Sequence, residues 1–488
     1  MKPIDERQPE EQDPQYDELI TLLQHASLDP MLVDPHERAH ILSQARARLF
    51  PTDPEIFQPE HMAAPALRAL GSFPSKPKTL ADKPLRGKRL LRMLNRLAAV
   101  LVIAALLGAS LLFFQHRLPL TRNHVTNVTQ TYASFVAKNG IMFGFDAQHT
   151  NANPFEQILN PTTVGDLKEK WAYKTRGQID SSPAVTGDVV YVGSADGNVY
   201  ALDAVSGAKK WAFRTGNNVA SSPAVVGGVV YVGSADGNVY ALDAASGAKK
   251  WTYRTGNPVL SSPAVTGGVV YIGAFDGMIY ALDAASGAKK WAFRTGGPFT
   301  SSPTVAGGMV YVAGSTDGNV YALDATSGAK KWVFNTGGQV FSSPAVVGAM
   351  VYVGSHNGIY ALDATSGAKK WVFNTGWSVV SSPAVAGGMV YVGAFDGMIY
   401  ALDAASGAKK WTYRTGGPIG VGSSPTVAGG VVYVVSTDGN VYALDATSGA
   451  KKWAFRTGSI TSSPAVAGGM VYVGSMNMDM YAFHLPGT

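Results

Sequence analysis

The 488-residue chain contains no cysteine. This absence excludes disulfide bridges, thiolate metal sites, iron–sulfur clusters, cysteine nucleophiles and a lipid anchor on an N-terminal cysteine. Only 15% of the residues are charged and 46% are hydrophobic, so the chain has too few charges for a disordered protein. It is also too long for one ordinary core. The 55 glycines, 21 tyrosines and 9 tryptophans favour short aromatic strands joined by tight turns over a helical bundle.

The charges are separated along the chain. Residues 1–60 carry thirteen acids and five bases, whereas residues 61–96 carry nine bases and one acid. We expect an acidic, partly helical segment at 1–60, in which Asp34, Pro35 and Glu37 begin a capped helix, and a basic, proline-rich linker at 61–96. The histidines of the first segment have no cysteine or carboxylate at ligand spacing, so we expect no metal site there.

Residues 97–114 form an uncharged and almost wholly apolar run, LAAVLVIAALLGASLLFF, which is about the minimum length for one helical crossing of a bilayer. Six bases closely precede the run and only Arg117 and Arg122 closely follow it, so the positive-inside rule predicts a cytoplasmic N-terminus. A buried core helix would need a partner face, and a cleaved signal peptide would need a shorter leader and an A-x-A-like site. We expect a single-pass protein of the cell membrane with a stalk at 115–138 and an extracytoplasmic domain at 139–488.

The extracytoplasmic domain consists of repeats. Each unit reads SSPAV, VVYVGS, an Asp-Gly turn, NVYALDA, a Ser-Gly turn and KKWxFRTG, which predicts four short strands. A period of this length with four strands is typical of a propeller blade. Tryptophans recur at spacings of 39 to 42 residues, and we expect them to dock adjacent blades: Trp171, Trp211, Trp251, Trp291, Trp332, Trp371, Trp411 and Trp453.

The two ends of the repeat region predict how the ring closes. The last unit, 462–488, lacks a tryptophan strand, and the first tryptophan strand, 168–175, stands alone. Pairing the two completes an eighth four-stranded sheet and leaves no free edge at the seam. We therefore predict an all-β fold, an eight-bladed β-propeller of antiparallel blades closed by the N-terminal strand. An open solenoid is the alternative, and it would leave the lone strand unpaired.

The segment ALDAVSGAKKW at 201–211 and its six further copies resemble the tryptophan-docking motif A-x-D-x-x-T-G-x-x-x-W of the PQQ-binding-like, or quinoprotein-type, β-propeller family, with serine in place of threonine. The segment FGFDAQHTNANP at 143–154 looks like the lead-in that precedes the first blade in that family. The resemblance implies tryptophans packed between blades. In the family's dehydrogenases it also implies a PQQ cofactor over a tryptophan floor, with calcium bound by Glu, Asn and Asp.

The propeller has few residues suited to that chemistry. After residue 60 the only glutamates are Glu156 and Glu169, and from residue 155 onward the aspartates outside the repeat motifs are Asp166, Asp180, Asp188 and Asp479. Calcium requires several convergent oxygens. The sequence also lacks G-x-S-x-G, H-E-x-x-H and phosphate-binding glycine motifs. We expect no enzyme, no cofactor and no metal; the alternative is a PQQ-dependent quinoprotein dehydrogenase that also binds calcium.

The loops that join each tryptophan strand to the next SSP strand vary most against the fixed repeat, and apolar or aromatic tips predominate in them. As a hypothesis, six residues of these loops line a funnel for a peptide, a protein segment or a small ligand: Asp180, Asn217, Asn218, Phe299, Phe341 and Trp377. Neutral drift in tolerant loops would leave the same pattern. The lysine pairs are dispersed around the ring, which favours a solvated rim over a nucleic-acid track. The predicted function is a non-catalytic, membrane-anchored scaffold or sensor; its partner and oligomeric state stay open.

Overall fold

The computed structural model describes residue 135 and residues 142–314, 316–419 and 422–487. The predicted cytoplasmic segment, linker and membrane span lie outside the described residues, as does the predicted stalk apart from Phe135. Within the described part of the chain, no helix combines the length and the apolar character needed to cross a membrane.

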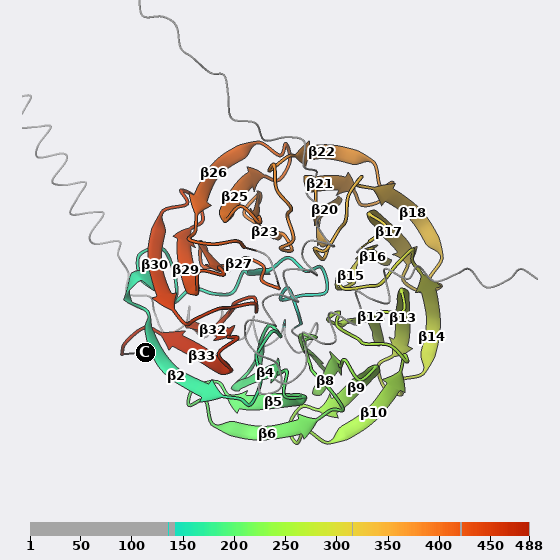
Figure 1. Cartoon of the computed structure of the whole chain (residues 1–488), viewed down its shortest axis with the longest axis horizontal. Coiled ribbons are helices and arrows are strands. Elements are labelled where there is room, and N and C mark those ends of the chain that lie inside the picture. The colour runs from blue at the N-terminus through green and yellow to red at the C-terminus, as the bar shows by residue number, and fades with distance from the viewer. Residues whose placement is uncertain (1–134, 136–141, 315, 420–421, 488) are drawn as a thin grey trace, which may run out of the picture. The chain divides into compact units, whose positions relative to one another are not determined.

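The described strands form eight sheets arranged as the blades of a closed ring (Figure 1). Blade 1 contains β3 (Ala184–Thr186), β4 (Val189–Gly193), β5 (Asn198–Asp203) and β6 (Lys209–Arg214); blade 2 contains β7 (Ala224–Val226), β8 (Val229–Gly233), β9 (Asn238–Asp243) and β10 (Lys249–Arg254). Blade 3 contains β11 (Ala264–Thr266), β12 (Val269–Gly273), β13 (Met278–Asp283) and β14 (Lys289–Arg294); blade 4 contains β15 (Thr304–Ala306), β16 (Met309–Ala313), β17 (Asn319–Asp324) and β18 (Lys330–Asn335).

The remaining blades repeat the same order. Blade 5 contains β19 (Ala345–Val347), β20 (Met350–Ser355), β21 (Gly358–Asp363) and β22 (Lys369–Phe373); blade 6 contains β23 (Ala384–Ala386), β24 (Met389–Gly393), β25 (Met398–Asp403) and β26 (Lys409–Arg414). Blade 7 contains β27 (Thr426–Ala428), β28 (Val431–Val435), β29 (Asn440–Asp445) and β30 (Lys451–Arg456); blade 8 contains β31 (Ala465–Ala467), β32 (Met470–Gly474), β33 (Asp479–His484) and β2 (Lys168–Lys174). The prediction of eight four-stranded antiparallel blades is confirmed.

The burial pattern of each strand follows its place in the blade. The second and third strands, such as β20 and β21, are almost continuously buried because both of their faces pack against neighbouring blades. The fourth strand lies at the outer edge of the ring, so only its tryptophan is fully covered, as Trp332 is in β18. The apolar runs of the repeat therefore become the interior of the ring.

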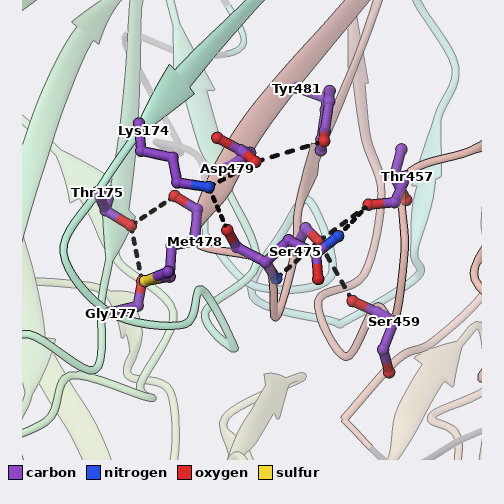
Figure 2. A network of polar contacts seen from close by, with 10 residues as sticks. Lys174, Thr175, Gly177, Thr457, Ser459, Ser475, Met478, Asp479 and Tyr481 are labelled. Carbon is purple, nitrogen blue, oxygen red and sulfur yellow. Dashed lines mark hydrogen bonds and ion pairs between the residues drawn. The ribbon is translucent and has the colours of Figure 1, made fainter.

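The seam of the ring closes as predicted. β2 pairs antiparallel with β33, from Lys168 opposite His484 to Lys174 opposite Asp479. Figure 2 shows the network at one end of this seam, where Lys174 Nζ donates to the carbonyl of Asn477 at 2.8 Å and lies 3.2 Å from Asp479 Oδ2. The backbone N–H and the hydroxyl of Thr175 both donate to the Met478 carbonyl at 2.8 Å. The first tryptophan strand thus takes the place of the missing fourth strand of blade 8.

Adjacent blades are joined by one recurring contact. Trp332 Nε1 donates to the carbonyl of Ala364 in the next blade at 3.0 Å, and the hydroxyl of Tyr311 donates to the same oxygen at 3.1 Å. Gly367 has a φ of +73°, and a Cβ there would lie 2.7 Å from Cδ2 of the Trp332 ring. The glycine of the Ser-Gly turn is therefore required both for its backbone conformation and for the approach of the indole.

The lead-in before the first blade crosses the central channel. The carbonyls of Ala147, Gln148, Thr150 and Asn151 accept hydrogen bonds of 2.7–2.9 Å from valine N–H groups of β15, β19, β23 and β27, the innermost strands of blades 4–7. β1 (Ala152–Asn153) then pairs in parallel with β27. Figure 1 shows this segment at the centre of the ring. We call the side of the ring that carries the loops joining one blade to the next the crossover face.

Candidate binding surface at the channel mouth

A closed ring of hydrogen bonds fixes the start of every innermost strand. The second serine of each SSP segment accepts from the backbone N–H of its counterpart in the preceding blade, as Ser343 Oγ does from Ser302 at 2.8 Å. The eight bonds span 2.8–3.0 Å, and the bond from Ser463 N to Ser182 Oγ completes the circle. Because each serine is locked to its neighbours, the residues just before it are held in a fixed arrangement around the channel.

The residue that directly precedes each SSP segment forms what we call the mouth ring. All eight members are described; seven are half-buried, and Gly422 of blade 7 is exposed. On one side of the ring, Asp180 Oδ1 accepts a 2.6 Å hydrogen bond from the hydroxyl of Thr461. On the other side, over blades 2–6, four of the five members are apolar. The mouth ring comprises Asp180, Ala220, Leu260, Thr300, Phe341, Val380, Gly422 and Thr461.

Phe299, which we predicted to line the funnel, belongs to the core. Its side chain has 0% exposure, and its Cδ1 lies 2.5 Å from where a Cβ on Gly273 would stand. The corresponding residues of the other loops, such as Val340 and Ile419, are buried in the same way. The prediction for Phe299 is therefore wrong, because the residue two places before the first serine points inward beneath the loop, and the residue one place before it reaches the mouth.

The other five predicted residues occupy three different levels of the crossover face. Asp180 and Phe341 belong to the mouth ring, whereas Asn217 and Trp377 lie farther back in their loops and are exposed, Trp377 by 60%. Asn218 is half-buried, and its Oδ1 is buried without a hydrogen-bond partner among the described residues. Only Asn217 and Asn218 contact each other, through a 2.7 Å bond from the Asn218 N–H to Asn217 Oδ1.

The sequence reasoning missed two elements of this surface. Leu260, Val380 and Thr461 were not singled out, although each stands directly before an SSP segment. The serine circle was also missed, although SSP is repeated in every blade. Aligning the repeats on the serines would have identified both, because a fixed residue next to a variable one marks a held position.

Ser378, next to Trp377, connects the loop after blade 5 to its neighbours. Ser378 Oγ lies 2.6 Å from His356 Nδ1, and the Ser378 carbonyl accepts from Phe395 N at 3.0 Å. The backbone N–H of His356 in turn donates to Gln339 O at 2.9 Å. Loops of blades 5 and 6 therefore present aromatic and neutral polar groups together at this part of the crossover face.

The repeat aspartates of the crossover face are bound to structural groups. Asp196 Oδ2 accepts from the Tyr200 hydroxyl at 2.7 Å and from Arg176 N at 3.0 Å. Burial acts to raise the pKa of Asp196, but these hydrogen bonds outweigh it and lower the pKa below its ordinary value. Burial and the bond to Asp196 raise the pKa of Tyr200. Asp196 is therefore an ionised support of the turn rather than a free acid.

Two known protein families match parts of the propeller. Residues 155–385 match the family described as the β-propeller of the beta-alanine-activating enzyme, and residues 317–486 match the family described as outer membrane protein assembly factor BamB. The chain is a PQQ-like β-propeller repeat protein. No curated protein matches it.

Several solved structures share the fold of this PQQ-like propeller. BamB from Moraxella catarrhalis is 23% identical with a TM-score of 0.58, over 65% of this chain and 99% of that one. Quinohemoprotein alcohol dehydrogenase from Comamonas testosteroni is 18% identical with a TM-score of 0.65, over 73% and 82%. The computationally designed Ika8 protein is 16% identical with a TM-score of 0.59, over 65% and 99%. The fold therefore occurs in an assembly factor, an enzyme and a designed protein, and does not decide between functions.

The residues at the mouth of the PQQ-like propeller do not fit a quinone with its calcium ion. The described mouth ring offers a single carboxylate, Asp180, which already accepts from Thr461. Calcium takes six to eight oxygen ligands. Within the described ranges, no three His, Asp or Glu side chains lie close enough together to hold a metal ion. The donor set that the quinoprotein resemblance implied is therefore not assembled at this surface.

Proposed function

We propose that this propeller is a non-catalytic binding module that holds an apolar segment of a protein or peptide at the mouth ring. The observation that carries the proposal is the group of four apolar side chains among the five members over blades 2–6, namely Ala220, Leu260, Phe341 and Val380. The lead-in is bonded to the innermost strands inside the channel. The proposed segment would therefore bind at the loops of the crossover face, outside the part of the channel that the lead-in fills.

The mouth ring is suited to binding because its side chains are held in advance. The serine circle fixes the backbone beneath them, so little conformational freedom would be lost on association. Burying the remaining exposed area of Phe341 and Leu260 contributes roughly 25 cal/mol per Å² of apolar surface. The polar side of the ring, with the Asp180–Thr461 pair, would orient the segment. The match to the BamB family, whose description names an assembly factor, supports a protein partner.

Removing the apolar contacts tests the proposal. The full chain is crosslinked in intact membranes, and captured proteins are compared between the parent and a Leu260→Ala, Phe341→Ala double variant. The matched control is Val205→Ala, which removes a side chain of 61% exposure from the turn between β5 and β6. We expect the control to retain its partner and the double variant to lose it. Equal capture by both variants would refute binding at the crossover face.

We further propose that residues 97–114 anchor the propeller outside the cytoplasm. The basic residues before the apolar run and their scarcity after it support this orientation. Because the chain has no cysteine, single substitutions report topology without background. An impermeant maleimide should label Val205→Cys in intact cells and Ser27→Cys only after lysis. The reverse pattern would show the opposite orientation.

The enzyme alternative is tested on the purified chain. PQQ and calcium are added, and quinone absorbance is recorded together with alcohol-dependent dye reduction. Because the mouth ring offers a single carboxylate, we expect no binding of PQQ or calcium beyond background. Stoichiometric uptake with turnover would replace the binding function by a dehydrogenase.

A further inference from the structure

The outermost strands of blades 4 and 5 differ from those of the other six blades. Val333 in β18 and Val372 in β22 are 46% and 43% exposed at the centre of the strand. The other blades carry alanine or threonine at this position. Two residues later, blades 4 and 5 have Asn335 and Asn374, whereas the others have arginine or lysine. Two changes of character thus occur together in two adjacent blades.

These strands are edges. β18 and β22 end the hydrogen-bonding order of their sheets in the described chain, so one side of each carries unpaired backbone groups. Exposed edges invite pairing with other chains, and proteins guard them with charged side chains. In most blades such a guard stands at both ends of the outer strand, for example Lys210 and Arg214 in β6. In blade 5 the second guard is replaced by the neutral Asn374, which directly follows β22.

Antiparallel pairing of an outer strand with the same strand of a second copy makes this difference decisive. When the pairing is centred on the middle residue, the second lysine of one copy lies opposite the residue four places later in the other. In β6 this opposes Lys210 and Arg214, and like charges directly across a strand pair are destabilising. In β22 it opposes Lys370 and Asn374, without repulsion, and brings two copies of Val372 together.

The intramolecular contacts of the lysine do not account for the difference. Lys370 Nζ lies 3.0 Å from Asp363 Oδ2, and the lysine of β6 is paired with an aspartate in the same manner. A β-bulge at this lysine also recurs in both strands. The bulge keeps the stretch of outer strand that could pair with a second copy short in both blades. On this reasoning, the charge of the residue opposite the lysine determines whether the two copies pair.

We propose that β22 is a self-association edge, at which a second copy of this chain pairs antiparallel about a two-fold axis at Val372. Such a contact is isologous, because each copy offers the same surface. β22 is favoured over β18 because Trp377, 60% exposed, stands three residues after Asn374, where the loop after β18 has Gly338 three residues after Asn335. The indole extends past the strand and adds apolar area to a short pairing. The contact uses the outer rim and leaves the mouth ring free.

Cysteine crosslinking tests the contact directly. Val372→Cys is introduced into the full, otherwise cysteine-free chain, and intact membranes are treated with a short bismaleimide, which tolerates either pairing geometry. We expect a covalent dimer from Val372→Cys and none from Ala212→Cys, the same position in β6. A yield no greater than that of Ala212→Cys would overturn the proposal. A greater yield from Val333→Cys would overturn the assignment to β22.

A charge substitution tests the reason for the contact. Asn374→Arg restores the residue that five other blades carry, so the fold is expected to tolerate it. The two-fold axis places the opposed pair in the interface twice, and we expect the association constant of the detergent-solubilised chain to fall about tenfold. An unchanged constant in sedimentation equilibrium would overturn the proposal. Partner capture at the mouth ring should be the same in both chains, which separates this test from that of the proposed function.

Discussion

Tyr311 and Tyr433 occupy the same position in blades 4 and 7, but their hydroxyl groups differ. The Tyr311 hydroxyl donates to Ala364 O at 3.1 Å, whereas the Tyr433 hydroxyl is buried without a partner among the described residues. The cause is the seam. The usual acceptor is the alanine carbonyl in the turn after the third strand of the next blade, and in blade 8 the third strand, β33, is not followed by such a turn. Trp453 Nε1 donates instead to Leu167 O at 3.0 Å, and no equivalent acceptor meets the tyrosine. Burial, with the charge of Glu156 adding to it, raises the pKa of Tyr433 well above its usual value, so it stays protonated.

Replacing each tyrosine by phenylalanine should have opposite effects on stability. Tyr311→Phe removes one hydrogen bond, but Ala364 O keeps its bond from Trp332, so no acceptor is orphaned. We expect a loss of about 1 kcal/mol in the free energy of unfolding. Tyr433→Phe removes a buried hydroxyl that gains nothing from the fold and loses its hydration. We expect that variant to be unchanged or more stable by up to about 1 kcal/mol.

Guanidinium denaturation of the full chain in detergent, followed by tryptophan fluorescence, compares the midpoints of the parent and the two variants. The pair is matched in residue type, strand position and burial, which is 3% exposure for Tyr311 and 0% for Tyr433. General effects of removing a hydroxyl therefore cancel. Equal destabilisation by the two substitutions would refute the reasoning, because it would mean that the Tyr433 hydroxyl is as well satisfied as that of Tyr311.

Three further substitutions test the ring and its lead-in by the same denaturation assay. Gly367→Ala should lower the free energy of unfolding by roughly 2 kcal/mol or more, because of the φ of +73° and the adjacent Trp332 ring. The control is Gly165→Ala, whose added Cβ would have its nearest contact at 3.6 Å and should cost under about 1 kcal/mol. Equal losses in the two variants would contradict the role of Gly367 in docking the indole. Ser343→Ala should cost about 1–3 kcal/mol, because it leaves a buried N–H of the preceding blade unpaired, and a neutral result would contradict the serine circle. Burial lowers the pKa of His149 from 6.5 to about 3, so the folded protein favours the neutral imidazole. The free energy of unfolding should therefore fall as the pH drops from about 6.5 toward 3, by at most about 1.4 kcal/mol per pH unit. His149→Gln should lack this part of the pH dependence, and an identical profile would show that His149 does not contribute to it.

The ring and its closure could be predicted from the sequence because both depend on local, repeated signals. Turn residues and alternating apolar residues define each strand, and the lone strand at 168–175 has one available partner. Counting was therefore sufficient to place β2 beside β33, which the structure confirms. The candidate surface was less predictable. Which loop residue points inward depends on the packing beneath it, as the buried Phe299 against Gly273 demonstrates, and hydrophobic character alone does not distinguish the two directions.

The lead-in is the part for which the repeat offers no guidance, and it gives the two ends of the channel different characters. A sequence with eight similar blades specifies a ring but does not by itself specify which end of the channel is covered. The lead-in does so with few contacts, since its backbone bonds to the innermost strands could form with any blade. Threonine replaces the alanine of SSPAV in blades 4 and 7. In blade 4 the Thr304 hydroxyl lies 2.9 Å from Nδ1 of the fully buried His149, whereas in blade 7 the Thr426 hydroxyl donates to Pro464 O at 2.7 Å. The contact with His149 therefore favours one register of the lead-in over those that the backbone bonds alone would allow. The asymmetry needed for a binding face thus comes from a departure in the repeat that meets a unique segment.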